Sequence, residues 1–78
     1  MSLDVSEIAK EFSERLIETG RELAKAKLEL RATQRRVEMA KAPIGALKAA
    51  EDAVTALEKE LERIREEEET VLIIALSL

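Results

Sequence analysis

The chain lacks cysteine, histidine, tryptophan and tyrosine, and its 78 residues include only one phenylalanine, one proline and two glycines. Without cysteine it can form no disulfide and no thiolate metal site. Without histidine and cysteine it has no usual general base near neutral pH, no thiolate nucleophile and no imidazole metal ligand. We therefore expect a protein that is not an enzyme, with no catalytic residue, no cofactor and no metal.

Long apolar runs are also missing. The most apolar stretch, residues 71–78, is well short of the roughly 20 residues that span a bilayer. The adjacent Glu66–Glu69 would be repelled by anionic lipid headgroups, so we expect no membrane partner. The N-terminus is acidic and does not resemble a signal peptide. These features predict a cytoplasmic protein, although a virion component would share them.

A basic, aromatic-rich segment is absent as well. The net charge is −4, and the arginine-rich part of the chain between residues 21 and 41 contains no aromatic residue on which a base could stack. We expect these basic groups to form ion pairs with the acidic second half of the chain rather than to bind nucleic acid. The predicted partners are therefore proteins.

Charge and heptad periodicity are what the sequence has in abundance. Charged residues make up 38% of the chain, which is typical of long helices and coiled coils. Small or apolar residues recur at alternating steps of three and four, which keeps one seam of a helix facing a partner helix. The seam residues are Val5, Ala9, Phe12, Leu16, Thr19, Leu23, Ala26, Leu30, Thr33, Val37 and Ala40, then Leu47, Ala50, Val54, Leu57, Leu61, Ile64, Val71, Ala75 and Leu78.

The seam is interrupted once, around Pro43. Proline removes a backbone donor and clashes with the preceding helical turn, and the heptad phase slips at the same place. The sequence therefore predicts an all-α, single-domain fold over residues 1–78. This fold is an antiparallel two-helix hairpin resembling a coiled coil, which completes a helical bundle by oligomerisation. We expect helices over 4–41 and 46–69, joined by a corner at 42–45.

The register of the hairpin follows from pairing the two seams about that corner. Placing residue n opposite residue 87 − n pairs Leu23 with Ile64 and centres the turn between residues 43 and 44. On one edge this register places Glu22 near Glu67, a like-charged pair. At the N-terminus, Asp4 and Glu7 have the spacing of a capping box, with Leu3 and Ile8 placed for a hydrophobic staple.

The segment 70–78 has conflicting signals. Its β-branched residues favour a strand, whereas Val71, Ala75 and Leu78 continue the helical seam. We expect it to continue the helix, the alternatives being a strand or a disordered tail.

Surplus apolar residues gather where the two ends of the chain meet, and such patches mark interaction sites. The candidate interface residues are Ile8, Phe12, Ile17, Val71, Leu72, Ile73, Ile74, Leu76 and Leu78. The sequence predicts a structural or assembly protein that self-associates as a homo-oligomer through its seams and this apolar open end. The alternative is a small adaptor or regulator whose tail, residues 70–78, docks on a different protein.

Overall fold

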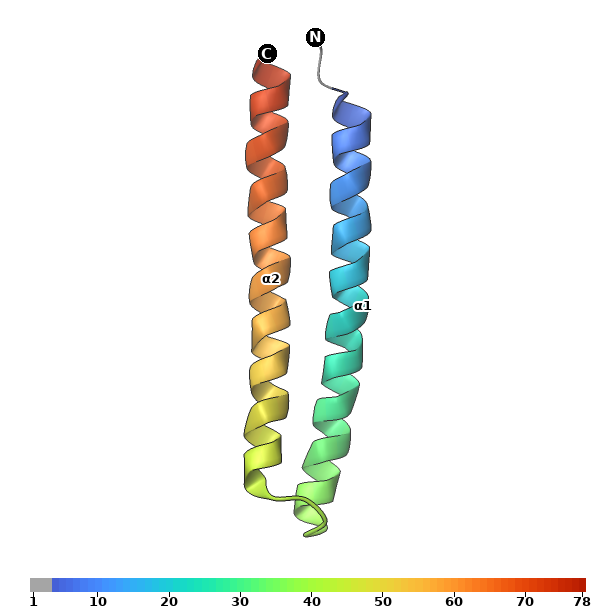
Figure 1. The fold of residues 1–78 in the computed structure, drawn as a ribbon, viewed down its shortest axis with the longest axis vertical. Helices are drawn as coiled ribbons and strands as arrows, with labels where there is room; N and C mark the ends of the chain where they lie inside the picture. Colours follow the sequence, from blue (N-terminus) through green and yellow to red (C-terminus); the bar gives the residue numbers. More distant parts are fainter. Residues whose placement is uncertain (1–3) are drawn as a thin grey trace.

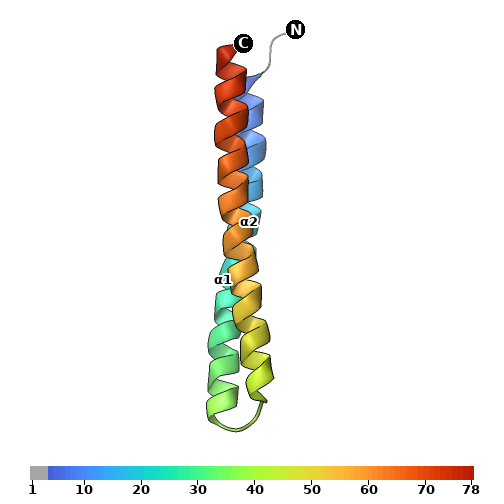
Figure 2. The same ribbon diagram turned by 90° about the vertical axis from the view of Figure 1, so that its left-hand side faces the viewer.

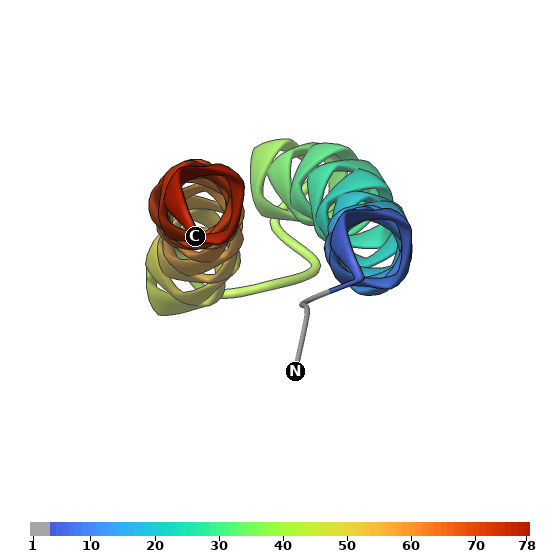
Figure 3. The same cartoon turned by 90° about the horizontal axis from the view of Figure 1, so that it is seen from above.

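The computed structural model describes residues 4–78, which form two helices of 34 residues each, α1 (Val5–Glu38) and α2 (Ile44–Ser77). The helices lie side by side and antiparallel, so that the first turn of α1 and the last turn of α2 are at the same end of the molecule (Figures 1 and 2). Viewed from above, the two axes cross at a shallow angle (Figure 3). The fold is therefore the predicted all-α antiparallel hairpin, with Cα extents of 61 × 15 × 12 Å.

The start of α1 is fixed by Asp4. Its backbone is extended, and its Oδ1 accepts hydrogen bonds from the backbone N–H groups of Ser6 (3.0 Å) and Glu7 (3.3 Å). These bonds satisfy two of the amides that a helix start leaves without a partner. Among residues 4–78 no return bond from the Glu7 side chain is present, so only half of the capping box forms. Leu3, the expected staple residue, lies outside the described residues.

The corner differs from the prediction, because α1 ends at Glu38 rather than 41 and α2 begins at Ile44 rather than 46. Ala40 adopts a left-handed conformation with φ 55°. Its N–H donates to the Val37 carbonyl (3.0 Å), and the Lys41 N–H donates to the Arg36 carbonyl (2.7 Å). This is the Schellman arrangement, which usually has glycine at the left-handed position. An alanine there gives no sequence signal.

The proline acts where α2 begins. Pro43 is the residue before the first helical turn, with φ −73° and ψ 155°, and its carbonyl accepts a hydrogen bond from the Ala46 N–H (3.0 Å). Its fixed φ suits this position, where the missing N–H removes no helical bond. The turn therefore comprises residues 39–43, and its centre lies nearer the N-terminus than predicted.

The register is correspondingly shifted by one heptad. The residue paired with Glu67 across the seam is Arg15, at 3.3 Å, and not Glu22, which lies seven residues further along α1. Thr19 and Ile64 also line the same groove. Residue n of α1 therefore lies opposite residue 80 − n of α2, which brings Leu16, rather than Leu23, to the height of Ile64. The predicted register was wrong because the early end of α1 moved the turn.

The core is a single line of side chains between the helices. Every predicted seam residue is buried or half-buried except Ala40, in the turn, and Leu78, at the chain end. The buried apolar residues are Phe12, Val54, Ile64 and Ala75, and the buried polar ones are Thr19 and Thr33. Within the described part of the chain no side chain is less than 2% exposed. The hairpin is thus held together by a seam that remains partly open to solvent.

Candidate functional site

The candidate site is the open end, where the last turns of α2 lie beside the first turns of α1 (Figures 1 and 2). Residues 70–77 belong to α2, so this segment is helical. Val71 is half-buried and Ala75 buried along the seam, which explains why the helix continues through β-branched residues. The Ser77 hydroxyl donates to the Ile73 carbonyl (2.7 Å) within the last turn.

The candidate interface residues occupy three different environments. Phe12 is buried in the seam, with the Arg15 guanidinium carbon 5.1 Å from its ring centroid, a cation–π geometry. A second group is half-buried along the edges of the seam, namely Ile8, Val71 and Leu72. A third group faces solvent, namely Ile17, Ile73, Ile74, Leu76 and Leu78. The apolar surface of the open end therefore comes mainly from the third group.

Charged side chains next to the open end form a network across the two helices. Arg63 on α2 donates to Glu60 (2.5 Å) and to Glu67 (2.7 Å), and Glu67 also accepts from Arg15 on α1 (3.3 Å). Exposed pairs of this kind contribute little individually, because solvent screens them. Their main effect is on the register, because Glu67 contacts an arginine from each helix and so opposes sliding of one helix along the other.

The same contacts change the proton affinity of Glu60. The hydrogen bond from Arg63 holds the pKa of Glu60 below its ordinary value of 4.5; the positive charges of Arg63 and Arg15 act in the same direction, whereas partial desolvation opposes them. Reciprocally, Glu60 raises the pKa of Arg63. Both groups are thus charged at neutral pH, and the pair is stable there.

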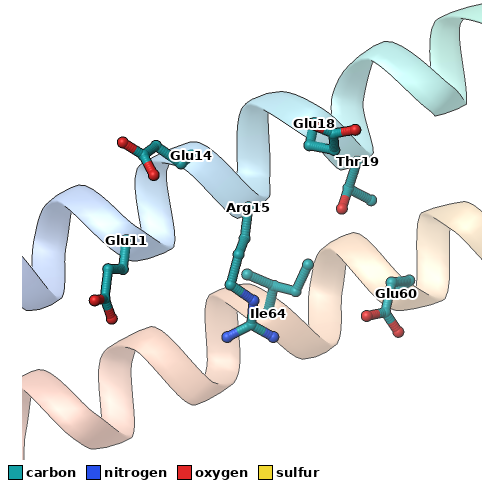
Figure 4. Close-up of a pocket in the computed structure, with 7 residues that line it drawn as sticks. All are labelled: Glu11, Glu14, Arg15, Glu18, Thr19, Glu60 and Ile64. Atoms are coloured by element: carbon teal, nitrogen blue, oxygen red, sulfur yellow. The ribbon is translucent and has the colours of Figure 1, made fainter.

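A shallow groove runs along this side of the seam. It is lined by Glu11, Glu14, Arg15, Glu18, Thr19, Glu60 and Ile64. Arg15 extends across the seam over Ile64, while Glu14 points away from α2 (Figure 4). The arginine thereby covers the middle of the groove, and the carboxylates stand along its rim. Residues 4–78 contain no group of three or more side chains placed to hold a metal ion.

A second polar cluster lies nearer the corner. Arg36 donates to the Glu29 carboxylate (2.7 Å) and to the hydroxyl of buried Thr33 (3.0 Å). This contact satisfies a polar group inside the seam, as buried hydroxyls require. Neither cluster was predicted, because both depend on side-chain geometry and the first also depends on the register.

Neither helix, over the range that the structure covers, is long and apolar enough to cross a membrane. Comparisons of the chain with protein-family models, with curated proteins and with solved structures found no match. The class of the protein, a two-helix hairpin with an apolar open end, is therefore defined by its own structure.

Proposed function

We propose that the protein is a non-enzymatic assembly protein that associates with copies of itself through its open end. The observation that carries the proposal is the exposure of large apolar side chains in the last turns of α2. Ile73, Ile74, Leu76 and Leu78 are between 54% and 88% exposed. A helix that is apolar on most sides is normally buried on most sides. One neighbouring helix cannot achieve that burial.

The exposed surface of the whole hairpin supports the same proposal. A compact monomer of 8.7 kDa has an accessible surface of about 4,700 Å². The hairpin exposes 6091 Å², about 1,400 Å² more than that expectation. This excess is larger than the area that a standard protein interface buries on each partner, about 800 Å². Association through one such interface would remove more than half of the excess surface of each chain.

The energy available from the open end is sufficient for association. If half of the four exposed side chains of the last turns become buried, the gain is about 3–6 kcal/mol. Further contact along the helices adds to this gain, which has to exceed the entropy lost on association. Micromolar affinity corresponds to about −8 kcal/mol. The open end therefore supplies a large share of the required energy, and the helix faces supply the rest.

Sedimentation equilibrium tests this proposal with two matched leucines. Leu76 lies at the open end and is 74% exposed, whereas Leu28 lies in the middle of α1 and is 66% exposed. The unchanged chain and Leu28→Glu should sediment at a multiple of 8.7 kDa. Leu76→Glu should be mainly monomeric at the same concentration.

A monomeric unchanged chain would overturn self-association. It would leave the adaptor alternative, in which the tail binds a different protein. Equal association of the two variants would show that the open end is not the contact.

A further inference from the structure

The hairpin has two faces, one on each side of the seam. Residues one heptad apart lie on the same side of a helix seam. Because Arg15 of α1 contacts Glu67 of α2, these two residues lie on the same side of the hairpin and identify that side on both helices. We call this side the paired face; it also contains Glu29, Arg36, Glu60 and Arg63. Four of the five ion pairs of residues 4–78 lie on it.

The opposite side, which we call the unpaired face, is divided into a basic and an acidic edge. Its α1 edge has Lys10, Lys27, Arg31 and Glu38, and its α2 edge has Lys48, Glu51, Glu58, Glu62, Arg65 and Glu69. Three basic groups against one acidic group give the first edge a formal charge of +2. Two basic groups against four acidic groups give the second edge −2. In the described part of the chain, only Lys48 makes an ion pair here, with Asp52 (3.2 Å).

From these edges we infer that the unpaired face binds a second copy of the chain, with the two-fold axis parallel to the helices. This inference rests on the proposed self-association and specifies its geometry. The result is a four-helix bundle in which each α1 lies against the α2 of the other copy. Both open ends then meet at the same end of the bundle.

Charge selects this orientation from the two that a face-to-face dimer allows. A two-fold axis across the helices would place α1 on α1 and α2 on α2, setting basic edge against basic edge and acidic against acidic. An axis along the helices sets opposite charges together. In the observed register, Lys10 reaches the height of Glu69 in the second copy, and Lys27 reaches the height of Glu51.

Apolar residues at the open end are compatible with the same orientation. Leu72 and Leu76 lie on the unpaired face of α2, one helical turn apart. With the axis along the helices, the two copies of this pair lie at the same end of the bundle. With the axis across the helices, they would lie against the turn end of the other copy, where Ile44 on the unpaired face of α2 is 76% exposed. Apolar contact is thus available in both arrangements, and charge decides between them.

The size of the face fits a stable dimer. Extents of 61 and 15 Å correspond to a face of about 900 Å² per copy. Two such faces would bury about 1,800 Å², which is within the range of standard interfaces, about 1,200–2,000 Å². The face is thus large enough to complete a bundle without any further element of the chain.

Charge reversal tests the assignment. An acidic chain carries Lys10→Glu, Lys27→Glu and Arg31→Glu; a basic chain carries Glu51→Lys, Glu58→Lys and Glu69→Lys. Each chain alone should dissociate at least tenfold more readily than the unchanged chain, because its two edges now have the same sign. An equimolar mixture should form heterodimers of twice 8.7 kDa. Pairing within one chain could not give this rescue on mixing.

A control chain distinguishes an effect of charge on the unpaired face from an effect of net charge alone. Arg21→Glu, Lys25→Glu and Arg35→Glu add the same negative charge to α1 outside the unpaired face, and this chain should self-associate like the unchanged one. Circular dichroism checks the helicity of every chain, and the single reversals Lys27→Glu and Glu51→Lys repeat the test if a triple variant unfolds. If the unchanged chain associates and the reversed chains associate equally well, the face assignment is wrong. If the unchanged chain is monomeric, the proposed function itself fails.

Discussion

Arg15 and Glu67 lie 52 residues apart in the chain, yet their side chains meet at 3.3 Å across the seam. This contact fixes the register of the hairpin, because Glu67 would face Glu22 if the helices were displaced by one heptad. In the observed register Glu67 therefore has the oppositely charged Arg15 as its neighbour, in place of the like-charged Glu22. The seam alone does not distinguish the two registers, since a shift of seven residues returns each apolar residue to an equivalent position.

Short thiol crosslinks measure this register directly, because the chain contains no cysteine of its own. We expect Arg15→Cys with Glu67→Cys to be joined by a short bis-thiol reagent under dilute, unimolecular conditions. The matched pair Glu22→Cys with Glu67→Cys should react slowly, because seven residues correspond to about 10 Å along a helix. Mass spectrometry distinguishes the products. Preferential crosslinking of the second pair would contradict the observed register and support the one predicted from the sequence.

Ala40→Gly should stabilise the fold. The left-handed conformation of Ala40 (φ 55°) costs a residue with a Cβ about 1–2 kcal/mol, and part of that gain is offset by the greater freedom of glycine in the unfolded chain. We expect a net gain of about 0.5–1 kcal/mol in urea unfolding at fixed protein concentration. Ala49→Gly, in an exposed part of α2, should instead destabilise by about 1 kcal/mol. Equal losses in both variants would argue against the turn that we describe.

Thr19→Val should stabilise the hairpin more than Thr33→Val. Both threonines are buried, but the Thr33 hydroxyl accepts a hydrogen bond from Arg36 (3.0 Å). The Thr19 side chain points toward α2 across the groove (Figure 4), and a methyl group there would extend the apolar seam. We expect a gain of about 1 kcal/mol for Thr19→Val. Thr33→Val should be near neutral, because it loses a bond while gaining apolar contact. Thermal unfolding of the two variants side by side measures the difference.

The pKa of Glu60 should respond to Arg63. Because the pKa of Glu60 in the folded chain is below 4.5, the contact with Arg63 stabilises the fold at neutral pH. That contribution is lost as the pH falls through the lowered pKa. Carboxyl-carbon NMR titration should show the pKa of Glu60 rising toward 4.5 in Arg63→Gln. Arg65→Gln, which changes an arginine on the other side of α2, should leave it unchanged. An unaltered midpoint in Arg63→Gln would contradict the contact.

Particular residues show how much of this structure the sequence could predict. The seam from Val5 to Val37 and the break near Pro43 were sufficient for two antiparallel helices, because periodicity reports directly which face is buried. The turn was not predictable in detail, since Ala40 adopts a conformation that sequence rules reserve for glycine or asparagine. That single residue ends α1 early and shifts the register. Of the apolar residues identified at the open end, five are exposed, whereas Phe12 is buried in the seam and three others are half-buried. The bridge from Arg15 to Glu67 depended on the register and was missed.

The most direct test of the central claim, that hairpins join with their open ends together, is a distance between copies. A nitroxide at Ser77→Cys, exposed in the last turn of α2 and outside the unpaired face, reports this distance by pulsed electron resonance. Diagonally placed helices in a four-helix bundle bring the two labels within about 35 Å of each other. Copies packed with opposite ends together would give about 50 Å, the length of α2. That longer distance, or the absence of any coupling between copies, would contradict the account.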